Sequence, residues 1–345
     1  MRKLYLLIFL LIVSLQAPAA EPVRLILDTD MGNDCDDALA LAMIHALQNR
    51  GEVRLLAVTI TKDNHDAATY VDLVNQFYGR PDIPIGVVHD GKTPKDGPMI
   101  KIPVERRDAR GNFVYPRRLK DGSQAPEAVE LLTRVLTDQP DGSVSIAQIG
   151  FSTNLARLVA TPEGRALAAR KVKALYLMAG NFQKPQREFN VYIDAPAFKD
   201  LMKNWPGPII FSGFEIGLVI TYPIESIQHD FAWATNHPVV EAYKVYVNKE
   251  EDHPNWDSTA VLDAIRPDRG YFDLSDPGDV GLGDKDATVF KPNPSGKCRF
   301  LILKARSGEP DSRTNCRLGQ RTPAKTRSRF GCPAHGILSF FKQAR

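Results

Sequence analysis

The sequence predicts an α/β protein with an open, mainly parallel sheet and helices on both of its faces. Short apolar runs rich in Val, Ile and Leu alternate with longer segments in which apolar residues recur at helical spacing. An acidic loop follows the first of these runs directly, at the place where open α/β sheets bind their ligands. Alternation of this kind is typical of βαβ units, which form parallel sheets.

Each expected element rests on its own pattern. Strands are expected where aliphatic and β-branched residues are continuous, at 23–27, 53–61, 85–88, 144–150, 172–178 and 208–212. Helices are expected where apolar residues gather on one face, at 38–48, 65–78, 125–137, 155–160, 195–204, 237–247 and 257–265. Residues 91–123 are rich in Pro, Gly, Lys and Arg and show little periodicity, so we expect a long loop over the sheet edge.

The first twenty residues differ in composition from the rest of the chain. Arg2 and Lys3 precede an apolar run over 4–15, and small residues follow up to Ala20. This order is typical of a secretory signal peptide, which we expect at 1–20 with cleavage after Ala19 or Ala20. The protein is therefore expected to be secreted or periplasmic. The apolar run is short for a membrane span and nothing later resembles one, so no span is expected.

Charge divides the remaining chain into a body at 21–304 and a basic tail at 305–345. The tail holds nine Lys or Arg and two Asp or Glu, a net charge of +7, whereas the whole chain carries only +3. The residues before the tail therefore carry a net charge of −4. This balance gives no reason to expect a nucleic-acid partner for the body. The tail lacks apolar periodicity and is expected to be solvated or disordered.

Five carboxylates fall within ten residues at the first junction of strand and helix: Asp28, Asp30, Asp34, Asp36 and Asp37. Such close negative charges repel one another unless a cation neutralises them or some of them take up protons. A cluster with only oxygen ligands suits a hard ion such as Ca²⁺ or Mg²⁺. We therefore expect a divalent-metal site here. The simpler alternative is that Asp36 or Asp37 only caps the following helix, which would use one carboxylate of the five.

Four motifs resemble the inosine-uridine nucleoside hydrolase family. Residues 28–32 and 36–37 resemble its D-x-D-P-G-x-D-D fingerprint, although Met31 replaces the commonest Pro and two extra residues precede the acidic pair. The segment 149–156 resembles the family's G-P-L-T-N-L-A turn, and 178–192 resembles its M-G-G…E-F-N segment. Trp256-Asp257 opens a helix where the last metal carboxylate of the family is expected. The resemblance covers roughly residues 23–304 and implies a nucleoside hydrolase-like fold with a Rossmann-like core.

The resemblance implies hydrolysis of the N-glycosidic bond of ribonucleosides. It implies a calcium ion held by Asp30, Asp37, the backbone carbonyl of Thr153 and Asp257. Asp30 would be the general base, acting on a water molecule that the ion acidifies. This ligand set contains only oxygen, as Ca²⁺ prefers. The implied substrate-binding residues are Asp36, Asn64, Met178, Asn181, Glu188, Asn190 and Trp256.

Trp256 lies where many relatives that accept pyrimidines carry a His, a candidate acid for the leaving base. An indole is a poor proton donor, but it can stack on a purine. The sequence therefore favours purine nucleosides. The alternative is that Trp256 is an ordinary core residue.

Other functions stay open at this stage. The D-x-D also resembles the loop of haloacid-dehalogenase-like enzymes, but Gly32 stands where that loop requires Thr or Val. A calcium-dependent ribose- or glycan-binding protein without turnover would share the same fold, and so would a hydrolase of another ribosyl compound. The expected partner is a small-molecule nucleoside, and the sequence leaves a homodimer or a homotetramer open.

Overall fold

The computed structural model describes residues 21–94 and 97–304 of the chain. The predicted signal peptide at 1–20 and the basic tail at 305–345 lie outside these residues. Within the described part, no helix combines the length and the apolarity that a membrane crossing requires.

The strands of the main sheet are β1 Val23–Thr29, β2 Val53–Lys62, β3 Ile85–Lys92, β4 Val144–Gln148, β5 Val172–Met178, β6 Ile209–Ser212, β9 Phe272–Leu274, β10 Gly278–Leu282, β11 Thr288–Pro292 and β12 Cys298–Leu303. They run in the order β11-β10-β12-β6-β5-β4-β1-β2-β3, with β9 paired to β12. All neighbours from β12 through β6 to β3 are parallel, whereas β9, β10 and β11 pair antiparallel. The strands β7 Thr221–Tyr222 and β8 His253–Pro254 form a separate antiparallel pair.

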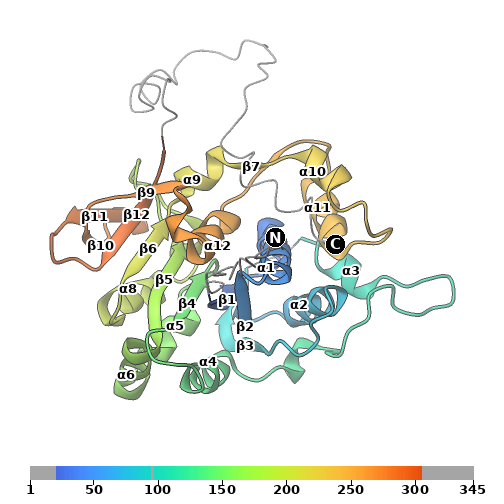
Figure 1. Ribbon diagram of the computed structural model, residues 1–345, viewed down its shortest axis with the longest axis horizontal. Helices are drawn as coiled ribbons and strands as arrows, with labels where there is room; N and C mark the ends of the chain where they lie inside the picture. The colour runs from blue at the N-terminus through green and yellow to red at the C-terminus, as the bar shows by residue number, and fades with distance from the viewer. Residues whose placement is uncertain (1–20, 95–96, 305–345) are drawn as a thin grey trace, which may run out of the picture.

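Two layers of helices cover the sheet (Figure 1). On one face lie α1 Asp36–Asn49, α2 His65–Phe77, α3 Lys101–Glu105, α9 Phe214–Val219, α10 Ile224–His229, α11 Pro238–Val247 and α12 Asp257–Ile265. On the other lie α4 Ala128–Thr137, α5 Thr153–Leu158, α6 Pro162–Lys171, α7 Phe189–Tyr192 and α8 Ala195–Asn204. In β1, Leu25 and Leu27 belong to the first core and Ile26 to the second, because successive strand residues face opposite sides. Both sides are buried, which explains the continuous apolar run.

The predicted open, mainly parallel sheet with helices on both faces is confirmed. β5, α8 and α12 have the predicted bounds, and α4 begins three residues later than the 125 expected. The antiparallel strands from 272 to 292 were not predicted, because their runs are short and half exposed. The segment 91–123 is not wholly loop, since it also contains α3 and the 3₁₀ turn Gly122–Gln124.

The chain reverses its direction of travel across the sheet at β1. This strand pairs with β2 on one side and with β4 on the other. Open α/β sheets bind ligands beyond the carboxyl ends of the strands at such a switch point. The acidic loop leaves β1 at this end, so the topology brings it to the expected place for a site.

Candidate active site

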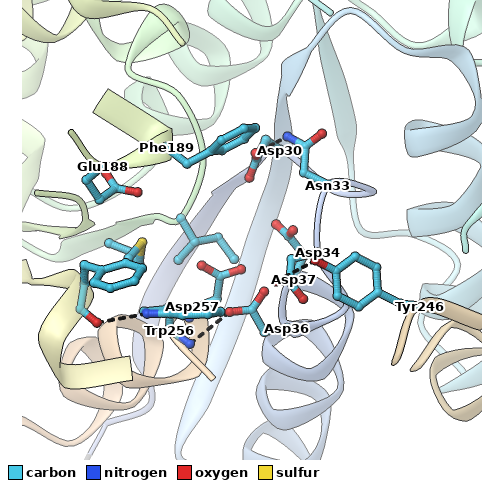
Figure 2. A pocket seen from close by; sticks show the side chains of 13 residues that line it. Asp30, Asn33, Asp34, Asp36, Asp37, Glu188, Phe189, Tyr246, Trp256 and Asp257 are labelled. Carbon is cyan, nitrogen blue, oxygen red and sulfur yellow. Dashed lines mark hydrogen bonds between the residues drawn. The ribbon is translucent and has the colours of Figure 1, made fainter. Parts of the chain in front are cut away.

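A tight turn connects β1 to α1 and carries the acidic loop. Gly32 lies in this turn with φ of +112°, and an added Cβ would lie 2.6 Å from Ile100 Cδ1. A residue with a side chain would therefore be both strained and crowded here. The turn directs the side chains of Asp30, Asp36 and Asp37 into one cavity (Figure 2).

The cavity has a volume of about 270 Å³ and thirteen lining residues. Six of these are carboxylates: Asp30, Asp34, Asp36, Asp37, Glu188 and Asp257. The others are Asn33, Ile149, Met178, Phe189, Phe214, Tyr246 and Trp256. Seven of the eleven predicted site residues therefore come together here, from the loop after β1, from α1, from the end of β5, from the residue before α7 and from the start of α12. Of the lining residues, all in the described part of the chain, none is Lys, Arg or His.

Asp36, Asp37 and Asp257 form the tightest group of carboxylates. One oxygen from each lies within 4.8 Å of the others, and all three side chains are buried. Burial raises the pKa of Asp36 to about 8, and the charge of Asp34 adds to this rise. Burial, together with the charges of neighbouring carboxylates, raises the pKa of Asp37 and of Asp257 well above the ordinary value. Close oxygen ligands whose charges repel one another are suited to a hard divalent cation.

Asp36 joins two helices that are far apart in the sequence. Its Oδ2 accepts hydrogen bonds from the backbone N–H groups of Trp256, at 2.9 Å, and Asp257, at 3.1 Å. A carboxylate at these free amides stabilises the beginning of α12. The alternative that Asp36 or Asp37 only caps α1 is wrong, because both lie inside the first turn of α1 and its N-cap, Cys35, makes no side-chain cap. Asp37 instead accepts a hydrogen bond from the Thr29 hydroxyl.

Asp30 lies at the end of β1 beside Asn33. The Asn33 amide donates to Asp30 Oδ2, and Asn33 Oδ1 in turn accepts a hydrogen bond of 3.0 Å from Lys62 Nζ. Burial raises the pKa of Asp30 to about 6, although the charge of Lys62 acts in the opposite direction. Without any bound cation, Asp30 is thus mostly ionised at neutral pH.

Glu188 faces the acidic loop from the other side of the cavity. Its Oε1 accepts from the backbone N–H of Asn190 at 2.9 Å, and its Oε2 accepts from those of Gly180 and Val191. Burial raises the pKa of Glu188 to about 7. The Asn190 amide donates to the carbonyls of Ile149 and Met178, at 3.0 and 3.1 Å, and so ties two cavity-lining segments together.

Four predicted site residues do not line the cavity. Asn190 lies behind it, and Asn181 Oδ1 accepts from the backbone N–H groups of the turn that follows it. Asn64 is the N-cap of α2 and accepts from two backbone N–H groups of that helix. Thr153 is the first residue of α5, and its hydroxyl donates to Asp194 Oδ2 at 2.6 Å. The side chains of Asn64 and Thr153 therefore form hydrogen bonds that stabilise local structure and do not face the cavity.

Aromatic side chains form the remaining wall. The rings of Trp256 and Phe214 stack with centroids 5.4 Å apart, and Trp256 Nε1 donates to the Phe214 carbonyl at 2.9 Å. Gly217 allows this approach, because an added Cβ would lie 2.3 Å from Trp256 Cα. Phe189, which is 38% exposed, and Tyr246, beside Asp34, also line the cavity.

Six lining residues received no individual role in the sequence analysis, although Asp34 was counted in the acidic cluster: Asn33, Asp34, Ile149, Phe189, Phe214 and Tyr246. Asn33 and Asp34 belong to the acidic loop, so their position already placed them near the site. Ile149 and Phe189 lie inside recognised motifs, but a motif does not say which of its apolar residues face the cavity. Phe214 and Tyr246 carry no local sequence pattern that would indicate a site.

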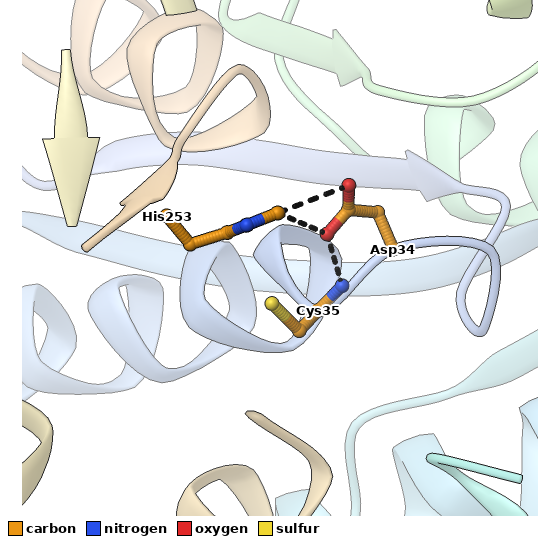
Figure 3. A group of neighbouring side chains, drawn as sticks. All are labelled: Asp34, Cys35 and His253. Carbon is orange, nitrogen blue, oxygen red and sulfur yellow. Dashed lines mark hydrogen bonds and ion pairs between the residues drawn. The ribbon is translucent and has the colours of Figure 1, made fainter. Parts of the chain in front are cut away.

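A polar cluster at the rim of the cavity contains Asp34, Tyr246 and His253. The Tyr246 hydroxyl donates to Asp34 Oδ2 at 3.1 Å, and His253 Nε2 lies 3.1 Å from Asp34 Oδ1 (Figure 3). Burial lowers the pKa of His253, but its bond to Asp34 and the charge of that carboxylate outweigh burial, so the pKa is raised. Cys35 is adjacent, and burial raises the pKa of its thiol, so it behaves as a small core residue.

Sequence comparison finds relatives with the predicted activity in their names. An inosine-uridine preferring nucleoside hydrolase of Leishmania major is 28% identical over 188 residues, which cover 51% of this chain and 55% of that protein. The pyrimidine-specific ribonucleoside hydrolase RihA of Klebsiella pneumoniae is 30% identical over 206 residues, 56% of this chain and 60% of that protein. The chain thus spans somewhat more than half the length of these relatives. Both names denote N-glycosyl hydrolases, the enzyme class that the sequence predicts.

Solved structures of the same fold cover more of the chain. A plant nucleoside hydrolase superposes with a TM-score of 0.62 at 19% identity, over 94% of this chain and 98% of its own. An inosine-guanosine nucleoside hydrolase superposes with a TM-score of 0.60 at 18% identity, over 81% and 93%. The sequence model of the inosine-uridine preferring nucleoside hydrolases matches residues 25–295. The chain therefore belongs to the inosine-uridine preferring nucleoside hydrolase family.

Proposed function

We propose that this protein hydrolyses the N-glycosidic bond of ribonucleosides to ribose and free base, with a preference for purines. One observation carries the proposal: a cavity of about 270 Å³ is lined by a cluster of buried carboxylates and, beside it, by a stacked aromatic pair. The volume is slightly below the range of about 300–1,000 Å³ that is typical of sites for drug-sized ligands. A nucleoside has one hydroxyl-rich end and one flat apolar end, and the two walls of the cavity match them.

The carboxylates fit a divalent cation, and we infer that it is Ca²⁺. Asp30, Asp37 and Asp257, which line the cavity, would hold it together with the backbone carbonyl of Thr153, a ligand that only the family resemblance implies. The fit rests on the donor set, which is all oxygen, and on burial and mutual repulsion, which together raise the pKa of Asp37 and of Asp257. When bound, the ion would orient sugar hydroxyls and make a nearby water molecule more acidic.

Asp30 is the proposed general base. The Asn33 amide donates a hydrogen bond to Asp30 Oδ2, and a pKa of about 6 keeps the Asp30 carboxylate ionised at neutral pH. A base with a pKa slightly below the working pH is both deprotonated and able to accept a proton. Asp30 would therefore take the proton of the water that attacks the anomeric carbon.

Glu188 is the residue that we propose binds the sugar hydroxyls. Three backbone N–H groups fix its carboxylate in the cavity wall. Bond cleavage creates oxocarbenium character on the ribose, and a fixed carboxylate stabilises this positive charge as it develops. Asn181 and Asn190 would act behind Glu188, because their amide groups hold the backbone of the surrounding turns.

The purine preference rests on Trp256. Its indole stacks on Phe214 and forms a flat apolar wall, which offers a purine more contact area than a pyrimidine. The main alternative is binding without catalysis, because the same cavity would serve a calcium-dependent protein that only binds ribose or a glycan. A hydrolase of another ribosyl compound is the second alternative, since one structural neighbour is an effector protein complexed with adenosine diphosphate ribose.

The test is release of the free base from inosine, adenosine, guanosine, uridine and adenosine diphosphate ribose, with calcium and with a chelator. We expect release that requires calcium, favours the three purine nucleosides and falls by at least about a thousandfold in Asp30→Ala. Nucleoside binding without release, by protein shown to be folded and metal-loaded, would favour the binding-protein alternative. Release from adenosine diphosphate ribose alone would favour the second.

We also propose export of the mature protein to the periplasm or the medium. The expected result is an N-terminus at Ala20 or Glu21 in protein recovered from that fraction. An uncleaved protein confined to the cytoplasm would contradict this proposal.

A further inference from the structure

Lys62 is fully buried at the carboxyl end of β2, behind the acidic loop. Its exposed fraction is 0%, and it does not line the cavity. A buried ammonium group is costly unless charge and hydrogen bonds compensate it. Its surroundings therefore indicate what this lysine does.

The ammonium group of Lys62 connects to Asp30 through one intermediate side chain. Nζ donates to Asn33 Oδ1 at 3.0 Å, and the Asn33 amide donates to Asp30 Oδ2. The turn itself leaves room for this arrangement, because a Cβ added to Gly32 would lie 3.1 Å from Nζ. The link thus depends on a glycine in the acidic loop and on a lysine in the neighbouring strand.

The charge of Lys62 acts on two carboxylates of the cavity, Asp30 and Asp37. It opposes the effect of burial on Asp30 and on Asp37, lowering the pKa of each. On the far side of the cluster, His253 acts in the same sense on Asp36. Since the described residues that line the cavity include six carboxylates and no cationic side chain, Lys62 supplies compensating charge from behind the wall.

We propose that Lys62 is a positioning residue with two roles: through Asn33 it fixes the orientation of Asp30, and its buried charge offsets part of the negative charge of the cavity. The first role rests on the proposed function of Asp30. The second does not, because it concerns cation affinity and the stability of the metal-free protein. A cation held behind the cavity competes electrostatically with any cation inside it.

The test compares Lys62→Met with Lys92→Met in the otherwise unchanged protein. Lys92 is exposed and is the register partner of Lys62 in β3, so it controls for loss of a lysine at the same sheet edge. Calcium, titrated by calorimetry, is expected to bind Lys62→Met about tenfold more tightly, since one opposing charge is removed. In chelator, the urea midpoint of Lys62→Met is expected to fall, and calcium is expected to restore it. Lys92→Met is expected to match the wild type in both measurements.

Two further variants separate the roles. Asn33→Ala keeps the charge and removes the link, so we expect calcium affinity within about twofold of wild type and a kcat at least about tenfold lower at similar KM. Lys62→Arg keeps a cation at this position, and we expect it to restore wild-type calcium affinity.

Weaker calcium binding by Lys62→Met, with no fall of its urea midpoint in chelator, would overturn the charge role. An unchanged kcat in Asn33→Ala would overturn the positioning role. If the wild-type protein releases no ribose, the proposed function fails, yet the calcium and urea measurements still decide the charge role. If the wild type binds no calcium, the urea midpoints in chelator decide it by themselves.

Discussion

The two ends of the parallel strands differ in how charged side chains are arranged: like charges cluster at one end, and opposite charges pair at the other. At the carboxyl edge, Asp36, Asp37 and Asp257 crowd together and repel one another. At the amino edge, Glu52 meets Arg266 in a two-pronged ion pair, with Arg266 Nε 2.6 Å from Glu52 Oε2 and a second bond to Oε1. Bidentate pairs of this kind are among the strongest charge-assisted hydrogen bonds.

A single helix connects these edges. α12 begins with Asp257 in the cavity and has Arg266 as its C-cap, where Arg266 also donates to the Tyr271 hydroxyl. One end of the helix therefore lowers the stability of the metal-free fold, and the other end raises it. The charges at the amino edge thus pair within the fold, whereas those at the carboxyl edge repel one another until a cation offsets them.

The strongest test of this comparison is Asp37→Asn. The amide keeps an acceptor for the Thr29 hydroxyl but removes one charge from the cluster. We expect ribose release to fall by about a thousandfold through loss of metal binding, whereas the metal-free protein becomes at least as stable as the wild type at pH 8. Urea unfolding in chelator and a ribose assay measure the two effects. A large loss of metal-free stability would show that Asp37 stabilises the fold directly.

Arg266→Met tests the other edge. It leaves Glu52 without its partner, and because the Glu52 side chain is 26% exposed, the expected cost is about 2–3 kcal/mol. Activity per folded molecule is expected to stay unchanged. The control is Arg170→Met, which removes an exposed arginine 3.9 Å from Asp141 and should cost less than about 0.5 kcal/mol. Equal costs in both variants would contradict the special role of the amino edge.

The raised pKa values of the buried acids make the stability of the metal-free protein depend on pH. Burial raises the pKa of Asp30 to about 6, of Asp28 and Glu188 to about 7, and of Asp36 to about 8. The folded protein thus binds more protons than the unfolded chain between about pH 4 and pH 8, so its stability must fall as the pH rises through this window. We expect a loss of more than about 2 kcal/mol without metal, and a flatter profile with calcium. Metal-free stability that is constant from pH 5 to pH 8 would contradict this account.

The smallest expected effect concerns the aromatic wall. Trp256→Leu removes the stacking surface, and we expect kcat/KM for inosine to fall by about tenfold while uridine changes less. Trp256→Phe keeps a ring and should retain most of the purine activity. Uridine serves as the internal control, so equal losses for both nucleosides would assign Trp256 to the core.

Local patterns in the sequence were sufficient to predict the strands, loop and helix that carry the acidic residues of the site. The strands β1 to β6, the acidic loop after β1 and the helix that opens at Asp257 all follow from residues close together in the chain, whereas β9 to β12 do not. Hydrophobic periodicity reports burial, and a D-x-D after a strand places carboxylates at a sheet edge, so neither inference requires knowledge of distant contacts.

Only the tertiary structure decided how the site is assembled. Asp36 binds the amide of Trp256, a residue 220 positions away, and Lys62 reaches Asp30 through Asn33. The walls formed by Phe214 and Tyr246 likewise come from separate helices and loops. These contacts depend on the packing of elements that are far apart in the sequence. The energy of such packing is distributed over many residues, so no local motif predicts it.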